Sequence, residues 1–365
     1  MSIEHRVGNC NSTLVTQCSE LLLIDFRTDV LTPPTDEMWD AMRRAELGWT
    51  LYRQDRAVNE LEERGAELLG KQAAMFLPTC SMANLLALMT LGERGTQAVV
   101  ETSAHILTSE EEGIKSIAGL FPRAVNGTRG VINPNDVADA IENAPRTPTY
   151  KSKTSLVCLE NSHNNAGGVA LNLAQTNAIA NIAHQYNARV YLDGARLFNS
   201  AAALNVSAKQ LVENVDAVGI SLNKGLCAPY GALLCGTREM IDAARVNAKR
   251  IGAASIHKAG IFAAAALVAL ATMLERLQED NQRAQKLARA LAQHIDIDLA
   301  TVQTNIVFAD ISKLKISPNE FVSRLEQRGI LIYARPNSRV RFVTHRLIDA
   351  DEIDCAVAAV SEICA

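Results

Sequence analysis

The feature that most constrains this chain is the alternation of short, mostly apolar runs with longer amphipathic stretches. Runs dominated by Ala, Val, Ile and Leu occupy residues 98–101, 155–160, 188–192, 217–222 and 232–235. Strands that are apolar along their whole length are typical of a sheet buried on both faces. Because amphipathic stretches such as 174–186 separate the runs, the pattern predicts an α/β fold with a mainly parallel sheet covered by helices.

Other segments have helical periodicity. The spacing of their apolar residues predicts helices over 35–69, 81–91, 238–250 and 259–293. Ser81 is the expected N-cap of the second of these helices, because a Ser hydroxyl can accept a hydrogen bond from a free N–H group of the first turn. Residues 1–20 are polar and show no secretory cleavage pattern, so we expect a loose arm there.

The pattern changes after Asp298. Strands are expected at 304–311, 330–334 and 340–344, interleaved with helices at 317–328 and 348–363. This order is typical of a small α+β unit. The expected organisation is an N-terminal arm over 1–24, a large α/β domain over 25–275 and a small C-terminal α+β domain over 276–365.

Composition excludes several classes of protein. The 365 residues include 36 Lys and Arg and 40 Asp and Glu, so the net charge is -4. A chain with this charge has no overall positive potential that would attract nucleic acid. No apolar run approaches the ~20 residues of a membrane span. The eight cysteines form no CxxC pair, and Cys227 and Cys235 lack the spacing and His partners of a zinc site. We therefore expect reduced thiols in a cytoplasmic protein, no metal, no membrane or nucleic-acid partner, and a small-molecule ligand.

Two polar residues stand at the carboxyl ends of neighbouring predicted strands. Asp193 follows the run 188–192, and Lys224 follows the run 217–222. Taken separately, Asp193 is as easily a turn or capping residue, and a lysine at a strand end is more often simply exposed. Taken together they suit pyridoxal phosphate, which needs a lysine amine for its Schiff base and a carboxylate facing its pyridine nitrogen. Open α/β sheets bind their ligands at this edge.

Residues at the ends of two other apolar runs complete a candidate cofactor site. Cys80 and Ser81 join an apolar run to a helix, where N–H groups and a hydroxyl bind phosphate, although Ser is also the ordinary capping residue. His105 follows the run 98–101. It is expected to lie flat over a cofactor ring, which suits a chain with only 4% aromatic residues, although a lone His is more often structural.

Three further residues are candidates for contacts with the cofactor ring and the substrate. Asn161 and His163 follow the run 155–160, and we expect them near the ring's 3-oxygen and the substrate side chain respectively. Arg341 lies in a segment that alternates polar and apolar residues. Its guanidinium is suited to the α-carboxylate of an amino acid. The alternative for Arg341 is a place on an exposed, charged strand face.

Read together, these residues resemble the motifs of the threonine aldolase family, fold-type-I pyridoxal phosphate enzymes also grouped as β-eliminating lyases. The resemblance extends from Asp25 to at least His345. It rests on five ordered segments, which are DFRTDVLT at 25–32, LPTCSMAN at 77–84, LENSHN at 159–164, LDGARLFN at 192–199 and SLNKGLCAP at 221–229. It implies the family's fold, a large domain with a mainly parallel sheet and a smaller α+β C-terminal domain.

The resemblance also implies a role for each matching residue. Those at the cofactor would be Lys224 as the Schiff-base lysine, Asp193 at the pyridine nitrogen, Arg196 near the 3-oxygen, Cys80 and Ser81 at the phosphate, and His105 stacked on the ring. Those at the substrate would be His163 at the β-hydroxyl, with Thr28 and Arg341 at the carboxylate. At each of these positions this sequence has a residue that suits the stated role.

The sequence departs from the family pattern in two segments and at one loop position. Segments 48–57 and 252–258 differ from the family's motifs, and His257 aligns with the family arginine that reaches the phosphate of a neighbouring subunit. Cys80 replaces a Gly and therefore requires a backbone without positive φ. The resemblance implies a homo-oligomer, a dimer or a tetramer, with sites shared between subunits.

The leading hypothesis is pyridoxal phosphate-dependent aldol cleavage of a β-hydroxy-α-amino acid, such as threonine or allo-threonine, to glycine and an aldehyde. The altered segments leave open a related reaction on an amino acid, either racemisation or β-elimination. A third possibility is a homologue that has kept the scaffold and lost catalysis. Retention of Lys224, Asp193, His105 and Arg341 together argues against it.

Overall fold

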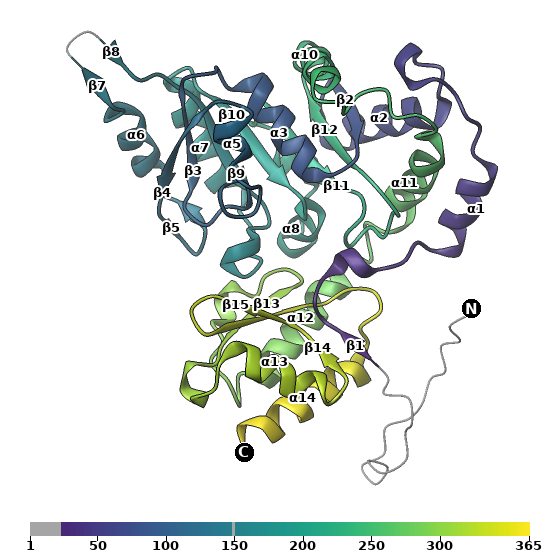
Figure 1. Ribbon diagram of the computed structural model, residues 1–365, viewed down its shortest axis with the longest axis vertical. Coiled ribbons are helices and arrows are strands. Elements are labelled where there is room, and N and C mark those ends of the chain that lie inside the picture. The colour runs from purple at the N-terminus through teal and green to yellow at the C-terminus, as the bar shows by residue number, and fades with distance from the viewer. Residues whose placement is uncertain (1–22, 148–149) are drawn as a thin grey trace.

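The computed structural model describes residues 23–147 and 150–365. In these residues the chain forms a large body around a seven-stranded sheet and a smaller body around a three-stranded sheet. Figure 1 shows the small body below the large one, with the N-terminal strand beside the C-terminal helices. In the described part, no single helix has both the length and the apolar composition of a membrane span, although the bent pair α11 (Gly260–Thr272) and α12 (Leu277–Leu291) together would meet those two criteria.

The large sheet has the strand order β2-β12-β11-β10-β9-β3-β4. Its strands are β2 (Ala73–Leu77), β3 (Gln97–Glu101), β4 (Phe121–Val125), β9 (Thr154–Glu160), β10 (Arg189–Gly194), β11 (Ala217–Ser221) and β12 (Ala232–Gly236). Strand β12 runs antiparallel to both of its neighbours, and the other pairs are parallel. The expected α/β fold with a mainly parallel sheet is confirmed.

Helices bury both faces of this sheet, and the alternation of side chains along each strand shows it. In β10, Tyr191 packs into one hydrophobic cluster, while Val190 and Leu192 pack into the other. The helices α3 (Cys80–Leu91), α5 (Gly113–Ser116) and α10 (Arg238–Arg250) cover the Tyr191 face. The opposite face is covered by α2 (Arg56–Leu69), α6 (Pro134–Glu142), α7 (Leu173–Gln185), α8 (Leu197–Leu204), α9 (Ala208–Leu211) and α11 (Gly260–Thr272). Double-sided burial explains why the inner strands are mostly apolar along their length.

Two long predicted helices are each broken in the structure. The segment 35–69 forms α1 (Asp36–Arg44) and α2, with a one-turn 3₁₀ helix, η2 (Thr50–Tyr52), between them. The break has two causes: Asp55 caps α2 by accepting a hydrogen bond from the Val58 N–H at 3.2 Å, and a Cβ at Gly48 would lie 2.2 Å from the Gln54 carbonyl oxygen. The segment 259–293 forms α11 and α12 (Leu277–Leu291), which meet at a bend of 69°.

The expected N-cap of α3 is wrong by two residues. The helix begins at Cys80, and Thr79 is its N-cap. Thr79 Oγ1 accepts a hydrogen bond from the Met82 N–H at 3.1 Å, so Ser81 lies inside the first turn with its hydroxyl free for another partner.

The region 105–151 contains short elements that the sequence did not predict. They are α4 (His105–Thr108), β5 (Gly127–Thr128), β6 (Val131–Ile132), β7 (Arg146–Thr147) and β8 (Tyr150–Lys151). The edge strand β4 was also missed. Its residues are largely exposed, so it lacks the continuous apolar run by which the inner strands were found.

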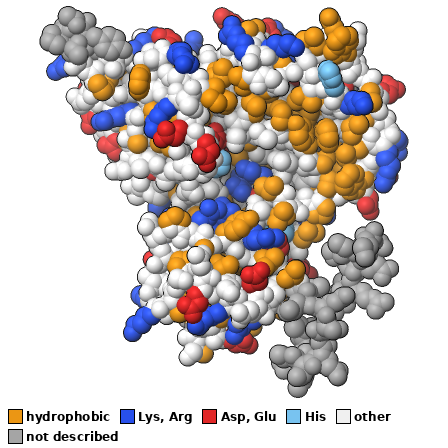
Figure 2. All heavy atoms as spheres, viewed as in Figure 1, with side chains coloured by type: hydrophobic (Ala, Val, Ile, Leu, Met, Phe, Trp, Pro, Cys, Tyr) orange, Lys and Arg blue, Asp and Glu red, His pale blue; other side chains and the backbone are white. Residues whose placement is uncertain are grey.

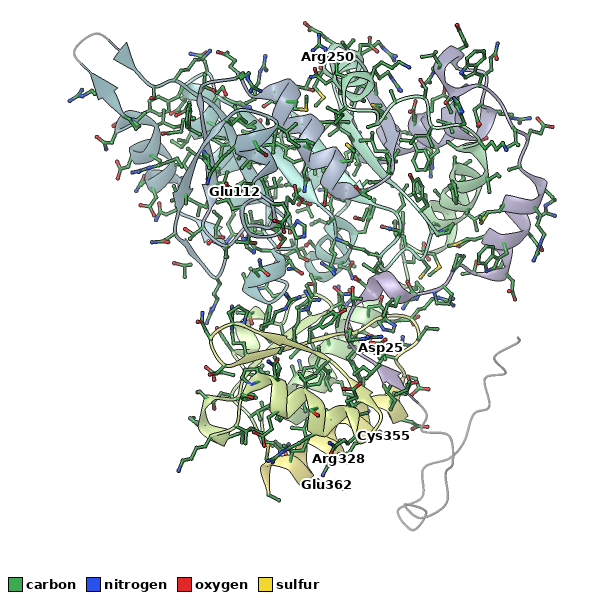
Figure 3. All side chains as sticks on the ribbon, viewed as in Figure 1. Asp25, Glu112, Arg250, Arg328, Cys355 and Glu362 are labelled. Atoms are coloured by element: carbon green, nitrogen blue, oxygen red, sulfur yellow. The ribbon has the colours of Figure 1, made fainter. Side chains whose placement is uncertain are left out.

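The small body has the antiparallel strand order β13-β16-β15. Its elements are α12, β13 (Ile306–Asp310), α13 (Pro318–Glu326), β14 (Ile330–Leu331), β15 (Tyr333–Arg335), β16 (Arg339–Val343) and α14 (Ala350–Cys364). Strand β1 (Ile24–Asp25) pairs in parallel with β14, and Phe26 packs in the core of this body. Arg328 and Glu362, 3.1 Å apart, lie at its far end, while Asp25 lies close to the junction of the two bodies (Figure 3). Short 3₁₀ helices occur at η1 (Asp29–Leu31), η3 (Asn164–Ala166), η4 (Leu299–Thr301) and η5 (Ser312–Leu314).

Candidate active site

The polar residues of the site lie at one edge of the large sheet. Strands β9, β10 and β11 are parallel neighbours, and Asp193 of β10 pairs in register with Glu160 at the end of β9. Strand β2 is antiparallel to β12, which is antiparallel to β11, so the end of β2 reaches the same edge. Lys224 and the first turn of α3 therefore come together with Asp193 at the carboxyl ends of the strands.

A cavity of about 410 Å³ opens at this edge between the two bodies. Figure 2 shows Lys and Arg side chains gathered in the hollow where the bodies meet. The predicted site residues that line the cavity are Thr28, Cys80, Ser81, His105, Asp193, Arg196, Lys224 and Arg341. The volume and the mixture of polar groups are within the range of a small-molecule site.

The surroundings of Lys224 shift its amine toward the neutral form. Burial lowers the pKa of Lys224, and the nearby positive charge of Arg196 lowers it further. The backbone of Lys224 is fixed by Thr32, whose hydroxyl donates to the Lys224 carbonyl at 3.1 Å. A neutral, positioned amine is the nucleophile that a carbonyl-containing cofactor or substrate requires.

The carboxylate of Asp193 is buried and held from two sides. Asn84 Nδ2 donates to Asp193 Oδ2 at 2.8 Å, and the Ala195 N–H donates to Asp193 Oδ1 at 3.1 Å. Asn84 is itself fixed because the hydroxyl of buried Tyr191 donates to Asn84 Oδ1 at 2.6 Å. This chain of hydrogen bonds gives Asp193 one orientation at the cavity wall.

His105 belongs to the same polar cluster. Its Nδ1 lies 2.9 Å from Glu110 Oε1, which also accepts a hydrogen bond from Asn84 Nδ2 at 2.7 Å. The hydrogen bond to Glu110 raises the pKa of His105, although burial opposes this shift. The backbone of His105 is anchored by its N–H, which donates to Glu160 Oε2 at 2.7 Å.

Arg196 forms a buried, two-pronged ion pair with Asp29. Arg196 Nε and Nη2 each donate to a different oxygen of Asp29 at 2.8 Å. Burial alone would raise the pKa of Asp29, but Arg196 and the hydrogen bonds to this carboxylate lower it well below its usual range. Asn164 Oδ1 accepts from Arg196 Nη1 at 3.3 Å and from Arg341 Nη1 at 3.2 Å, so it joins the two bodies across the cavity.

Arg341 reaches the cavity from strand β16 of the small body. Its Nη2 donates to the Arg27 carbonyl at 3.1 Å, and its Nε is buried without a hydrogen-bond partner among the described residues. Burial, together with the positive charges of Arg335 and Arg196, lowers the pKa of Arg341 to about 9. The alternative of an exposed, charged strand face does not hold, because Arg341 is buried. Arg341 lines the cavity, where the remaining N–H groups of its guanidinium can meet an anion.

The first turn of α3 fits a phosphate group. The first N–H groups of a helix lack intrahelical partners and attract anions. Cys80 lies inside the helix and its φ is not positive. The backbone at this position therefore accommodates a Cys in place of the Gly. Burial raises the pKa of the Cys80 thiol, which therefore stays protonated beside any anion.

Three predicted site residues do not line the cavity. Asn161 is buried and exchanges hydrogen bonds with the backbone of Leu171, at 2.9 Å and 3.1 Å. His163 is 1% exposed, and its Nε2 lies 3.0 Å from Glu101 Oε2 on the far side of the strand ends. His257 is exposed in the loop between α10 and α11. Within one subunit, the structure therefore keeps these three side chains away from the substrate.

Several cavity residues were not singled out from the sequence. Asp29, Asn84, Glu160 and Asn164 all lie within segments already recognised as motifs, so their place in those segments was the available signal. Arg335 lines the cavity as well but lies outside all of them. Nothing in the local sequence distinguishes Arg335 from a surface arginine.

The chain is similar to known proteins in both sequence and fold. The sequence profile of the family described as "Beta-eliminating lyase" matches residues 25–314. The chain is 36% identical over 335 residues to low-specificity L-threonine aldolase 1 of Arabidopsis thaliana, a match covering 90% of this chain and 93% of that protein. It is 28% identical over 349 residues to alanine racemase TOXG of Cochliobolus carbonum, covering 93% and 87% respectively.

The fold is also similar to that of solved structures. The structure of a threonine aldolase from Leishmania major superposes with a TM-score of 0.79 at 18% identity, covering 93% of this chain and 99% of that one. This similarity confirms the fold-type-I architecture that the sequence motifs implied.

Proposed function

Because the chain belongs to the threonine aldolase family of β-eliminating lyases, we propose that it cleaves a threonine-like β-hydroxy-α-amino acid to glycine and an aldehyde. The protein is then a pyridoxal phosphate-dependent carbon–carbon lyase. The observation that carries the proposal is a single cavity in which Lys224, Asp193 and Arg341 meet. Pyridoxal phosphate, when bound, accepts the electron pair left by the broken Cα–Cβ bond.

The residues at the sheet edge suit this cofactor. Lys224 would be its covalent attachment point, because its backbone is held by Thr32 and burial lowers the pKa of its amine. Asp193 would bind the protonated pyridine nitrogen, in the orientation that Asn84 imposes. Ser81 and the first turn of α3 would bind the phosphate, and His105 would stack on the ring. Arg196 would lie near the ring's 3-oxygen.

The small body would bind the substrate's carboxylate. Arg341 lines the cavity with N–H groups left over from its hydrogen bonds to Asn164 and Arg27, and Thr28 lies on the same wall. Fixing the carboxylate fixes the rotation about the bond from the substrate nitrogen to Cα. Held in this way, the substrate would have its Cα–Cβ bond oriented for cleavage.

His105 is the candidate base for the β-hydroxyl proton, directly or through a water molecule. It lines the cavity, and Glu110 holds its ring at 2.9 Å. His163 was the second candidate for this role. His163 is instead buried against Glu101. We therefore propose that His163 positions the loop that carries Asn164.

We propose a homo-oligomer in which subunits complete one another's sites. Large apolar side chains are exposed at Trp39, Leu47, Trp49, Leu51 and Tyr52. They belong to α1 and the segment after it, and Figure 2 shows an apolar surface over α1, α2 and α11. A second copy covering this surface would bring His257 toward the phosphate of its neighbour. The free cysteines of the described residues support a cytoplasmic location.

A second reaction is supported by one observation. A relative 28% identical over 93% of this chain carries the name of an alanine racemase. Racemisation uses the same cavity but breaks the Cα–H bond in place of the Cα–Cβ bond. Exchange of the substrate's α-hydrogen in deuterated water, without aldehyde formation, would favour it.

The proposal is tested with purified protein loaded with pyridoxal phosphate. We expect acetaldehyde release from threonine or allo-threonine, and loss of both the release and the cofactor's covalent absorption band in Lys224→Ala. The control is Lys209→Ala, because Lys209 is exposed on α9 and does not line the active-site cavity. A cofactor-loaded protein that leaves every β-hydroxy amino acid intact would refute the proposal.

A further inference from the structure

A second arginine of the small body reaches the active-site cavity. Arg335 ends strand β15, lies opposite Arg339 in the register with β16, and lines the same cavity as Arg341. No carboxylate of the described residues forms an ion pair with Arg335. Its Nε atom is buried and has no hydrogen-bond partner in that part of the chain. Arg335 lines the cavity, and none of the described residues accepts a hydrogen bond from its guanidinium.

The two arginines lie close enough to repel each other. The guanidinium carbons of Arg335 and Arg341 each lie 5.8 Å from the centroid of the Tyr333 ring. Burial lowers the pKa of Arg335, and the charges of Arg339 and Arg196 lower it further. The charge of Arg335 in turn helps to lower the pKa of Arg341. Two adjacent, partly buried cations without anions are unfavourable until a ligand brings negative charge.

One substrate carboxylate does not account for both arginines. The α-carboxylate is already matched by Arg341 and Thr28 in the proposed function. Arg341 gives one N–H of Nη1 to Asn164 and one N–H of Nη2 to Arg27, which leaves the second N–H of each for that carboxylate. Arg335 adds a complete, unpaired guanidinium beside it. A planar guanidinium binds carboxylate or phosphate through two parallel hydrogen bonds.

We propose that the preferred substrate is a β-hydroxy-α-amino acid whose side chain ends in a second anion, bound by Arg335. This inference rests on the proposed aldol cleavage. With β-hydroxyaspartate, the Cα–Cβ bond breaks and its electron pair stays on Cα, which takes up a proton to give glycine. The β-hydroxyl loses its proton as the β-carbon becomes a carbonyl, which gives glyoxylate. With 4-phosphooxythreonine the aldehyde product is glycolaldehyde phosphate.

The test compares matched substrates on the cofactor-loaded protein. β-Hydroxyaspartate and β-hydroxyasparagine have the same shape and differ in one negative charge, and 4-phosphooxythreonine tests phosphate as the anion. We expect kcat/KM for the better anionic substrate to exceed that for β-hydroxyasparagine at least about tenfold, because a charge-assisted pair forms only with the anion. Arg335→Gln should reduce this ratio about tenfold, mainly through KM. Arg328→Gln is the control and should leave the ratio unchanged, because Arg328 lies at the far end of the small body and does not line this cavity.

The outcomes separate this inference from the proposed function. Threonine cleavage without any preference for an anionic substrate would overturn the role of Arg335 and leave the aldolase proposal intact. An equal loss of kcat/KM for threonine and β-hydroxyaspartate in Arg335→Gln would also overturn it, since Arg335 would then contact the α-carboxylate. Absence of cleavage for every substrate would overturn both proposals together. A preference for either anion that Arg335→Gln removes would support the inference and identify the anion.

Discussion

The ion pair between Asp29 and Arg196 gives the sharpest prediction about how the site is held together. Replacing Asp29 with Asn keeps the shape of the side chain and removes its charge. The carboxylate is fully buried and meets Arg196 through two hydrogen bonds of 2.8 Å. It also accepts a hydrogen bond from Asn305 Nδ2 at 3.1 Å. Breaking a buried pair leaves an uncompensated charge, so we expect Asp29→Asn to lower the free energy of unfolding by roughly 3–5 kcal/mol.

The matched control is Asp25→Asn, four residues away. Asp25 also forms a two-pronged pair, with Arg27 at 2.6 Å and 2.9 Å, but the side chains are 25% and 36% exposed. A pair of this kind contributes roughly 0.2–1 kcal/mol. Urea unfolding followed by circular dichroism, at equal protein and cofactor concentration, measures both values. Equal losses for the two variants would refute the reasoning that burial makes the difference.

The pH dependence of the Asp29 effect is a second check on the same pair. The pKa of Asp29 is lowered in the folded protein, against an ordinary value of about 3.9 when unfolded. A lowered carboxyl pKa contributes stability that is complete above the unfolded pKa and is lost as pH falls through the folded value. The cost of Asp29→Asn should therefore be constant between roughly pH 5 and pH 8 and shrink only in stronger acid. A cost that disappears near neutral pH would contradict this assignment.

Three other changes test single contacts. Asn84→Ala removes the 2.8 Å hydrogen bond to Asp193. We expect about tenfold weaker binding of pyridoxal phosphate, measured by absorbance titration. Unchanged binding would show that Asp193 does not need this hydrogen bond. Glu110→Gln removes the main cause of the raised pKa of His105. The NMR titration of His105 should therefore move to lower pH. An unchanged titration would show that the contact between His105 and Glu110 does not form. Thr79→Ala removes the cap of α3 and should cost about 1 kcal/mol of unfolding free energy, whereas Ser81→Ala should cost much less.

The inner strands were predictable because burial on both faces leaves a simple signal. Strand β9 is buried at every position, and its run of apolar residues marks it without any knowledge of its neighbours. Strand β4 lies at the sheet edge and is largely exposed, so it carries no such signal. The break between α1 and α2 was hidden for a different reason. It depends on the close approach at Gly48, which brings residues 48 and 54 together.

The site was predictable where its residues follow strands directly. Asp193 and Lys224 line the cavity as expected, because parallel neighbours end at the same edge. His163 also follows a strand, but the chain turns there so that its ring meets Glu101 behind the loop. Arg335 could not be found from sequence, because its position depends on how the small body docks against the large one. Side chains that two bodies bring together have no common sequence signal.

The most direct test of the account is the fate of threonine in deuterated water with the cofactor-loaded protein, followed by NMR. Cleavage of the Cα–Cβ bond predicts acetaldehyde and glycine in equal amounts, with the remaining threonine unlabelled at Cα. Deuterium at Cα of threonine without any aldehyde would show that the cavity breaks the Cα–H bond instead. That result would contradict the central claim that this cavity directs carbon–carbon cleavage.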